Sequence, residues 1–105
     1  MFTFTNREFK EITAKAFVST EPLILKFFPA KEKRKFATLI TIIQAFDPSR
    51  AYHEREVNEI LKPIYHDWAI IRRYLVDYGF MSRTPDGSVY QVVRQDCKKF
   101  FESLT

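Results

Sequence analysis

The chain has 105 residues, a net charge of +4 at pH 7 and a hydrophobic content of 46%, which suit one domain around a single core. It contains only two glycines and one cysteine, so glycine-rich nucleotide loops and an internal disulfide are excluded. Charges run through the first 17 residues, and the longest apolar stretch (36–46) is too short to span a bilayer. We therefore expect one domain over residues 1–105 of a soluble, cytoplasmic protein with no membrane partner.

The first expected elements are a helix and a strand within residues 5–28. Thr5 or Asn6 can cap a helix that runs to about residue 18. Its apolar residues recur on one face at helical spacing: Phe9, Ile12 and Ala16. The run LILKFF (23–28) lies between two prolines and predicts a strand.

Two further helices are expected at residues 31–46 and 54–65. Each carries apolar residues at core spacing, namely Phe36, Leu39, Ile40, Ile43 and Phe46 in the first and Val57, Ile60, Leu61 and Ile64 in the second. DPSR (47–50) between them predicts a turn, and Pro63 should end or kink the second of these helices early.

A fourth helix is expected from Asp67, as its cap, to Gly79, which can adopt the left-handed conformation that ends a helix. FMSRT and SVYQVV flank Pro85-Asp86-Gly87 and predict a β-hairpin. A last amphipathic helix is expected at 94–104, where Phe100 can pack on the body or on a second subunit.

These elements fit one architecture. A short strand at 50–52 would precede the helix pair and complete a three-stranded antiparallel sheet with the hairpin. The predicted fold class is α+β, mainly α: a winged helix-turn-helix with additional N- and C-terminal helices. Agreement between local signals and a single architecture supports this prediction.

Two stretches carry a more specific resemblance: FPAKEKRKFATLITIIQAF and AYHEREVNEILKPIYHDWAIIRRYLVDYGFMSRTPDGSVY. They resemble the bacterial domain of unknown function 2087, through a Pro-x-Lys stretch, an apolar helix, a Tyr-Ser/Thr-Glu-x-Glu-Val-Asn motif, an Asp before a Leu-Arg-Arg-like segment, and a hairpin. The match covers about residues 29–90. It implies a winged-helix-like fold and a role in transcriptional regulation. His53 stands where the family usually has Ser or Thr, which weakens the cap of the helix at 54–65, although Glu56 can still reach back to a backbone amide.

Arg72 and Arg73 lie side by side on the fourth helix, where neighbouring residues differ by about 100°. Arg72 falls at the margin of the expected buried stripe, so its guanidinium should reach Glu56 or Glu59. Arg73 points away from the core and is the residue best placed to read a base or a phosphate. The alternative is an ion pair with Asp77, worth only about 0.2–0.5 kcal/mol, and both interpretations stay open.

Charge is unevenly distributed. Residues 47–79 contain five basic and six acidic side chains, whereas DNA-reading units are usually basic. Residues 31–35 carry a net +3 from Lys31, Lys33, Arg34 and Lys35 against Glu32. Cations at a helix start oppose the helix dipole by about 0.3–1 kcal/mol each, so this cluster invites an anion such as phosphate, unless it is simply a solvated surface.

No enzyme is expected, because no Ser/His/Asp or Cys/His arrangement emerges and the two histidines lack metal-ligand spacing. Accordingly, neither a cofactor nor a metal is predicted.

The first functional hypothesis is a DNA-binding transcriptional regulator whose helix at 67–78 enters the major groove of double-stranded DNA. Its predicted DNA contacts are Lys31, Lys33, Arg34, Lys35, Ala69, Arg73, Arg83 and Ser88. A homodimer through the terminal helices would pair half-sites. The alternative is a winged-helix module for protein contact, with Ile70 and the aromatic-rich termini as its interface.

Overall fold

Four helices and two small antiparallel sheets make up the computed structural model, which describes residues 2–96 and 100. The helices are α1 (Asn6–Ala16), α2 (Glu32–Ile43), α3 (Glu54–Leu61) and α4 (Trp68–Asp77). The strands are β1 (Phe17–Thr20), β2 (Leu23–Leu25), β3 (Ala51–His53), β4 (Met81–Arg83) and β5 (Val89–Val92). The predicted α+β class is confirmed.

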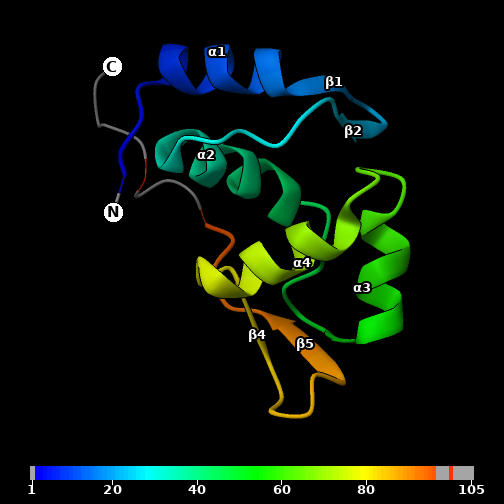
Figure 1. The fold of residues 1–105 in the computed structure, drawn as a ribbon. Helices are drawn as coiled ribbons and strands as arrows, with labels where there is room; N and C mark the ends of the chain where they lie inside the picture. The colour runs from blue at the N-terminus through cyan, green and yellow to red at the C-terminus, as the bar shows by residue number, and fades with distance from the viewer. Residues whose placement is uncertain (1, 97–99, 101–105) are drawn as a thin grey trace.

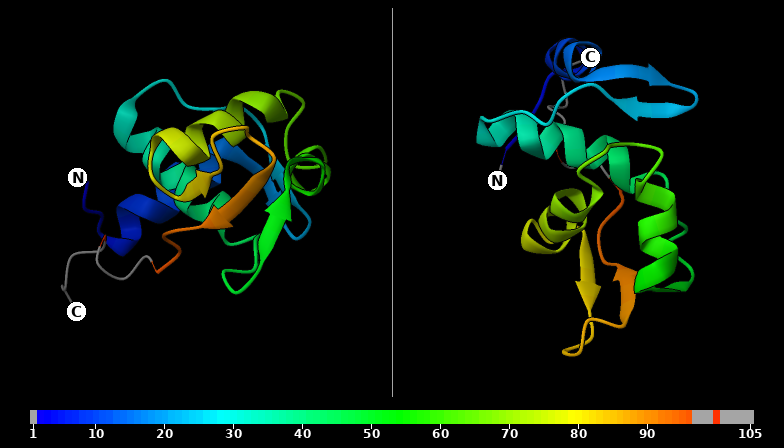
Figure 2. Two further views of the ribbon diagram at one scale, coloured as in Figure 1. Left: turned by 90° about the horizontal axis from the view of Figure 1, so that it is seen from below. Right: turned by 45° about the vertical axis from the view of Figure 1, so that its right-hand side comes forward.

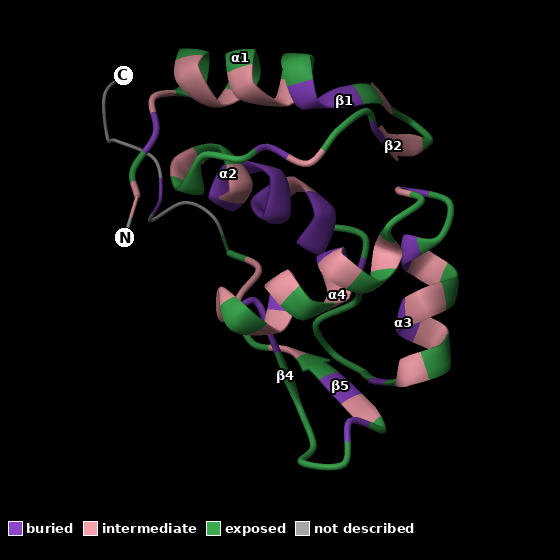
Figure 3. Ribbon diagram, viewed as in Figure 1, coloured by how far each residue is buried: buried purple, intermediate pink, exposed green. Residues whose placement is uncertain are grey.

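Helix α2 lies across the middle of the molecule, with α1 and the β1–β2 sheet on one side and α3, α4 and the second sheet on the other (Figure 1). Its apolar run explains this position, because seven of its residues are buried: Phe36, Ala37, Thr38, Leu39, Ile40, Ile42 and Ile43. The burial colouring of Figure 3 shows the same helix as the most buried element of the drawn ribbon. Thr38, the one polar residue in this set, donates its hydroxyl to the Arg34 carbonyl oxygen at 2.8 Å, so its burial leaves no polar group unsatisfied.

Aromatic rings fill the core beside the start of α2. The ring centroid of Phe36 lies 5.1 Å from that of Phe80 and 4.9 Å from that of Phe100. Phe4 stacks on the same ring at 6.4 Å. Tilted and edge-on aromatic pairs at these distances add roughly 0.5–1.5 kcal/mol each beyond their area burial. The chain segments before α1 and after β5 therefore meet on α2.

The N-terminal segment partly follows the prediction. Thr5 caps α1, with its hydroxyl oxygen accepting from the Glu8 amide at 3.0 Å. The helix ends at Ala16 rather than at 18, since Phe17 takes an extended backbone (φ −105°, ψ 139°) and begins β1. The prediction missed β1, whose Val18 has a β-branched side chain suited to strands. Of the strand predicted at 23–28, residues 23–25 form β2, which pairs with β1.

The middle helices are present but shorter than expected. Helix α2 spans Glu32–Ile43, not 31–46, although Phe46 is still buried in the turn that follows. Helix α3 ends at Leu61, not at 65, because Pro63 has no N–H to extend the helix. The Glu56 carboxylate accepts from the His53 amide at 3.0 Å, which confirms the predicted cap contact.

The helix α4 and the hairpin have the predicted order. Asp67 is the N-cap residue of α4, as predicted, but its side chain accepts no cap hydrogen bond, because its backbone lies outside the usual capping region (φ −92°, ψ 60°). Gly79 has φ +79°, which confirms the left-handed helix end. The predicted three-stranded antiparallel sheet is present in the order β3-β5-β4, with β3 one residue later than the expected 50–52.

The C-terminal helix predicted at 94–104 does not begin as expected, because residues 94–96 are not helical. Most of that prediction lies outside the described residues. Phe100 is fully buried on the body of the protein, as one of the two predicted placements had it, and its carbonyl oxygen accepts from the Phe4 amide at 2.7 Å. Gln95 holds the segment before it, since its side-chain amide donates to the carbonyl oxygens of Ile43 and Phe46.

Candidate functional site

Helix α4 and the β4–β5 hairpin face each other across a hollow of about 450 Å³. On α4, Ala69, Arg73 and Asp77 are exposed while Ile71 and Leu75 are fully buried, so the helix presents the strip predicted from its spacing. The charged residues that line the hollow are three arginines and three acids: Arg72, Arg73, Arg83, Glu54, Asp77 and Asp86. Its formal charge is therefore balanced.

Arg72 has a structural position. Its Nη1 lies 2.5 Å from the Asn58 side-chain oxygen and 3.7 Å from Glu54 Oε1, and its guanidinium carbon lies 5.6 Å from the centre of the Trp68 ring. The expected partners Glu56 and Glu59 are wrong. Glu54 and Asn58 stand one turn apart on the face of α3 that meets α4, whereas residues 56 and 59 point elsewhere.

The carboxylates expected for Arg72 have other partners. Glu56 pairs with Arg50, and Glu59 lies 3.3 Å from Lys62. The two contacts on Glu56 lower the pKa of its carboxyl, first through the hydrogen bond from the His53 amide and second through the Arg50 guanidinium. Glu56 therefore serves the start of α3 rather than α4.

Arg73 is the freer of the two arginines. Its Nε lies 3.5 Å from Asp77 Oδ2, and 75% of its side chain is exposed. Exposed pairs at this spacing contribute only about 0.3–0.5 kcal/mol. The Arg73–Asp77 ion pair, predicted from the sequence as the alternative to a DNA contact, is thus present. It is weak enough for a stronger anion to displace Asp77.

The hairpin tip is held by its own hydrogen bonds. Asp86 Oδ1 accepts from the Ser88 amide at 3.0 Å, from the Ser88 hydroxyl at 2.8 Å and from the Thr84 hydroxyl at 2.7 Å. These bonds stabilise the carboxylate, the Thr84 hydroxyl first, and lower the pKa of Asp86 to about 2. Arg83 donates to the carbonyl oxygens of Thr84 at 3.3 Å and of Pro85 at 3.5 Å. Arg83 and Ser88, two predicted phosphate contacts, therefore also form hydrogen bonds within the turn.

The predicted basic cluster is divided between two sides of α2. The Lys35 Nζ lies 5.1 Å from the centre of the Tyr74 ring on α4. Lys33 instead reaches α1, where its Nζ lies 2.9 Å from Glu8 Oε2. Lys31 and Arg34 line a second hollow, between α1 and α2.

The start of α2 lies on the α1 side of the molecule, away from the β4–β5 hairpin, as Figure 1 and the right view of Figure 2 show. The structure thus brings Ala69, Arg73, Arg83 and Ser88 to one end and does not bring residues 31–35 to them.

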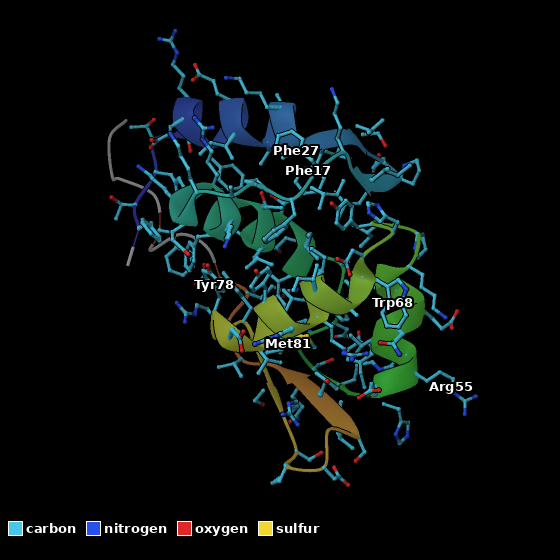
Figure 4. The ribbon with its side chains drawn as sticks, in the orientation of Figure 1. Phe17, Phe27, Arg55, Trp68, Tyr78 and Met81 are labelled. Carbon is cyan, nitrogen blue, oxygen red and sulfur yellow. The ribbon has the colours of Figure 1, made fainter. Side chains whose placement is uncertain are left out.

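Arg55 was missed as a candidate. It is exposed on α3 and projects away from the body of the protein (Figure 4), beside a hollow that it shares with His53 and Ser88. The usable signal was its place opposite Val57 and Leu61, the buried stripe of the same helix. Ile70, by contrast, is partly buried against the core rather than exposed, so it cannot serve as an open apolar contact.

Trp68 closes the seam between the two helices of the pair. It lies at the start of α4 beside α3 (Figure 4), with the Lys62 Nζ 5.4 Å and the Arg72 guanidinium carbon 5.6 Å from its ring centre. Both cations lie within range of attraction to the indole face. The pair α3–α4 is therefore held by polar and aromatic contacts as well as by its core.

Neither a metal site nor a membrane span is found in the part of the chain that the structure describes. Over residues 2–96 and 100, no three side chains of His, Cys, Asp or Glu gather closely enough to hold a metal ion. No helix there is both long and apolar enough to cross a bilayer.

Comparison with known proteins identifies the family but no individual relative. No curated protein and no solved structure matches the chain. A family described as "Uncharacterized protein conserved in bacteria (DUF2087)" matches residues 24–92, which begin within β2 and end with β5. The match confirms the resemblance seen in the sequence and begins five residues earlier than expected. The chain belongs to this family of uncharacterised bacterial proteins, DUF2087.

Proposed function

We propose that this chain is a DNA-binding domain of winged-helix type that acts in transcriptional regulation. The arrangement that supports the proposal is the order α2, β3, α3, α4, β4, β5 with the sheet order β3-β5-β4. In proteins that read DNA in this way, the second helix of the pair enters the major groove and the hairpin lies along the backbone. Here α4 takes the first role and the β4–β5 hairpin the second.

The observation that carries the proposal is the exposure of Arg73 on the outward strip of α4, next to Ala69. Ala69 leaves room for a base edge to approach the helix, and a guanidinium one turn later can donate two hydrogen bonds to guanine. Arg55 and Arg83 flank this strip from α3 and from the hairpin, where they can contact phosphates.

The expected salt dependence is moderate. Two arginines that each neutralise one phosphate, Arg55 and Arg83, give a slope of log K against log salt of about −1.8. The carboxylates of Asp77 and Asp86 near this strip keep the non-specific affinity low. Contacts to bases therefore have to supply more of the binding free energy than in a strongly basic domain.

The test is fluorescence anisotropy with a mixed-sequence duplex between about 50 and 200 mM salt. We expect Arg73→Ala to weaken binding by about 10-fold or more, the loss of one good base contact. The matched control is Arg7→Ala, because Arg7 is 90% exposed on α1 and its ion pair with Glu11 lies within that helix. An equal loss in both variants, or no binding at low salt, contradicts the proposal.

A second function, protein contact through the same face, has one observation in its favour. The hollow between α4 and the hairpin balances three arginines against three carboxylates, which suits a partner surface with charges of both signs better than a polyanion. In that case duplex affinity is absent at low salt. A captured partner would then stay bound through about 200 mM salt and dissociate on Ala69→Glu, which adds a large charged side chain to the exposed strip of α4.

A further inference from the structure

The second hollow of the molecule lies between α1 and the start of α2 and has a volume of about 310 Å³. We name it the α1–α2 pocket. Ten residues line it: Glu8, Glu11, Ile12, Lys15, Ala16, Phe27, Pro29, Lys31, Lys33 and Arg34. It belongs to the opposite end of the protein from the proposed DNA-binding face (Figure 1).

One wall of the pocket is apolar. Ile12 and Ala16 come from the inner face of α1, and Phe27 and Pro29 come from the segment between β2 and α2. The Phe27 ring, labelled in Figure 4 below α1, is 45% exposed, although an aromatic side chain of this size usually covers its surface. This wall therefore offers unburied apolar area directly beside the charged side chains.

The other wall carries cations that lack a carboxylate partner. Across the described residues, Lys15, Lys31 and Arg34 form no ion pair. The two carboxylates of the pocket are already engaged. Glu8 Oε2 lies 2.9 Å from Lys33 Nζ, and Glu11 Oε1 lies 3.3 Å from Arg7 Nε, outside the pocket.

This charge distribution distinguishes the two hollows. The lining of the α1–α2 pocket has four cations and two anions, whereas the hollow between α4 and the hairpin has three of each. A pocket with an apolar wall and a few convergent charged groups is the usual form of a small-molecule site, and such sites occupy about 300–1,000 Å³. The α1–α2 pocket is at the lower end of that range, so its ligand has to be compact.

We propose that the α1–α2 pocket binds a small organic carboxylate with an apolar body, of the size of an arylalkanoic acid. The carboxylate lies between Lys31 and Arg34, whose guanidinium can hold both oxygens at once. The hydrocarbon part covers Phe27 and Ile12 and removes their surface from water. This proposal stands independently of DNA binding, because it uses none of the residues on α4 or the hairpin.

The test is an amide-resolved NMR titration of the whole chain with phenylpropionate. We expect saturable shifts confined to residues 12–16 and 27–34. Two further probes separate the parts of the ligand: phenylpropanol has the same body without the charge, and inorganic phosphate has the charge without the body. Each should bind at least about 10-fold more weakly than the acid, since it loses a charge-assisted contact or the apolar burial.

Matched double variants test the residues. Lys31→Gln/Arg34→Gln should weaken phenylpropionate binding by about 10-fold or more without lowering the unliganded melting temperature, because these side chains support no internal ion pair and oppose the dipole of α2. The control Lys10→Gln/Lys26→Gln removes the same charge from exposed positions outside the pocket lining and keeps the Arg7–Glu11 ion pair, so it should leave binding unchanged. A Phe27→Ala variant should bind phenylpropionate more weakly but should bind phosphate as the wild type does.

Three results would overturn the proposal. The first is no saturable shift at these residues with phenylpropionate. The second is phosphate or phenylpropanol binding as tightly as the acid, which would mean a general anion surface or a general apolar one. The third is an equal loss of affinity in the pocket variant and in the control variant, which would assign the effect to net charge alone.

Discussion

At the scale of single residues, adjacent side chains on α4 have different functions because they point about 100° apart. Arg72 lies in the α3–α4 seam with 22% of its side chain exposed, and Arg73 is 75% exposed. Charge alone does not distinguish them, but their surroundings do. Only Arg73 can meet a partner without breaking a contact between helices.

This difference in exposure predicts that the same substitution lowers the stability of the protein at position 72 much more than at position 73. Arg72→Met keeps the apolar stem but removes the hydrogen bond to Asn58, so we expect the free energy of unfolding to fall by about 1.5–3 kcal/mol. Arg73→Met should change it by less than about 0.5 kcal/mol, because its ion pair is exposed. Urea unfolding of both variants measures this. Equal losses would show that the seam does not depend on Arg72.

The hydrogen bonds at the hairpin tip predict how its stability depends on pH. Asp86 should titrate with a pKa of about 2, well below its ordinary value of 3.8, because the Thr84 and Ser88 hydrogen bonds favour the carboxylate. A lowered pKa means that the tip is stabilised above pH 3.8 and loses this contribution as the pH falls towards 2. Carboxyl-detected NMR measures the value directly.

The control for Asp86 is the variant Thr84→Val, which removes the largest cause of the shift. Its Asp86 pKa should return part of the way towards 3.8. An Asp86 pKa that is the same in both proteins would mean that the hydrogen bond from Thr84 does not form in solution.

At the scale of elements, the sequence predicted which helices exist better than where they end. Apolar periodicity identified α2, and Gly79 marked the end of α4. Helix ends depend on competition with neighbours that one sequence does not display. Phe17 left the predicted helix because it pairs with Leu25 of β2, and Asp67 makes no side-chain cap because its backbone is not in the required region.

The candidate site was predictable to a similar degree. Helical geometry placed Arg73 outward correctly, since it depends only on positions within one helix. The cluster at 31–35 was treated as one patch, although α1 on one side and α4 on the other divide it. A linear run of charges says nothing about tertiary neighbours, so the pocket beside Phe27 could not be inferred from it.

A contact between elements makes another pH prediction. The Tyr78 hydroxyl at the end of α4 donates to a Glu32 carboxylate oxygen at the start of α2. Burial first, and this hydrogen bond second, raise the pKa of Tyr78 to about 12. A raised pKa means that the contact stabilises the fold below pH 10.0, the ordinary value, and that this contribution is lost as the pH rises towards 12.

Ultraviolet titration of tyrosinate measures this pKa, with Tyr78→Phe as the subtraction that assigns the signal. In Glu32→Gln the Tyr78 pKa should fall only part of the way back towards 10.0, since burial is the larger cause. A complete return would make the hydrogen bond the main cause and would contradict the packing around this ring.

At the scale of the whole molecule, the two proposed sites occupy opposite ends (Figure 2). They should therefore respond to separate substitutions, as sites without shared partners usually do. Arg73→Ala should weaken duplex binding and leave phenylpropionate binding intact, and Lys31→Gln/Arg34→Gln should do the reverse. Anisotropy and NMR titration of these two variants, of the wild type and of the control Lys10→Gln/Lys26→Gln measure both affinities.

A specific outcome would reassign the start of α2. If Lys31→Gln/Arg34→Gln lowers duplex affinity more than the charge-matched control does, then these cations contact phosphates, as the sequence first suggested. A loss equal to that of the control would instead reflect net charge alone, and the separation of the two surfaces would stand.

Trp68 is the only tryptophan of the chain, and it lies in the α3–α4 seam under Lys62 and Arg72. The intrinsic fluorescence of the protein is therefore an optical reporter of one seam, readable without any label. Rearrangement of the helix pair on binding a partner would change the tryptophan emission. Ligand binding in the distant α1–α2 pocket would leave the emission unchanged. Trp68 emission therefore distinguishes binding at the helix pair from binding in the α1–α2 pocket.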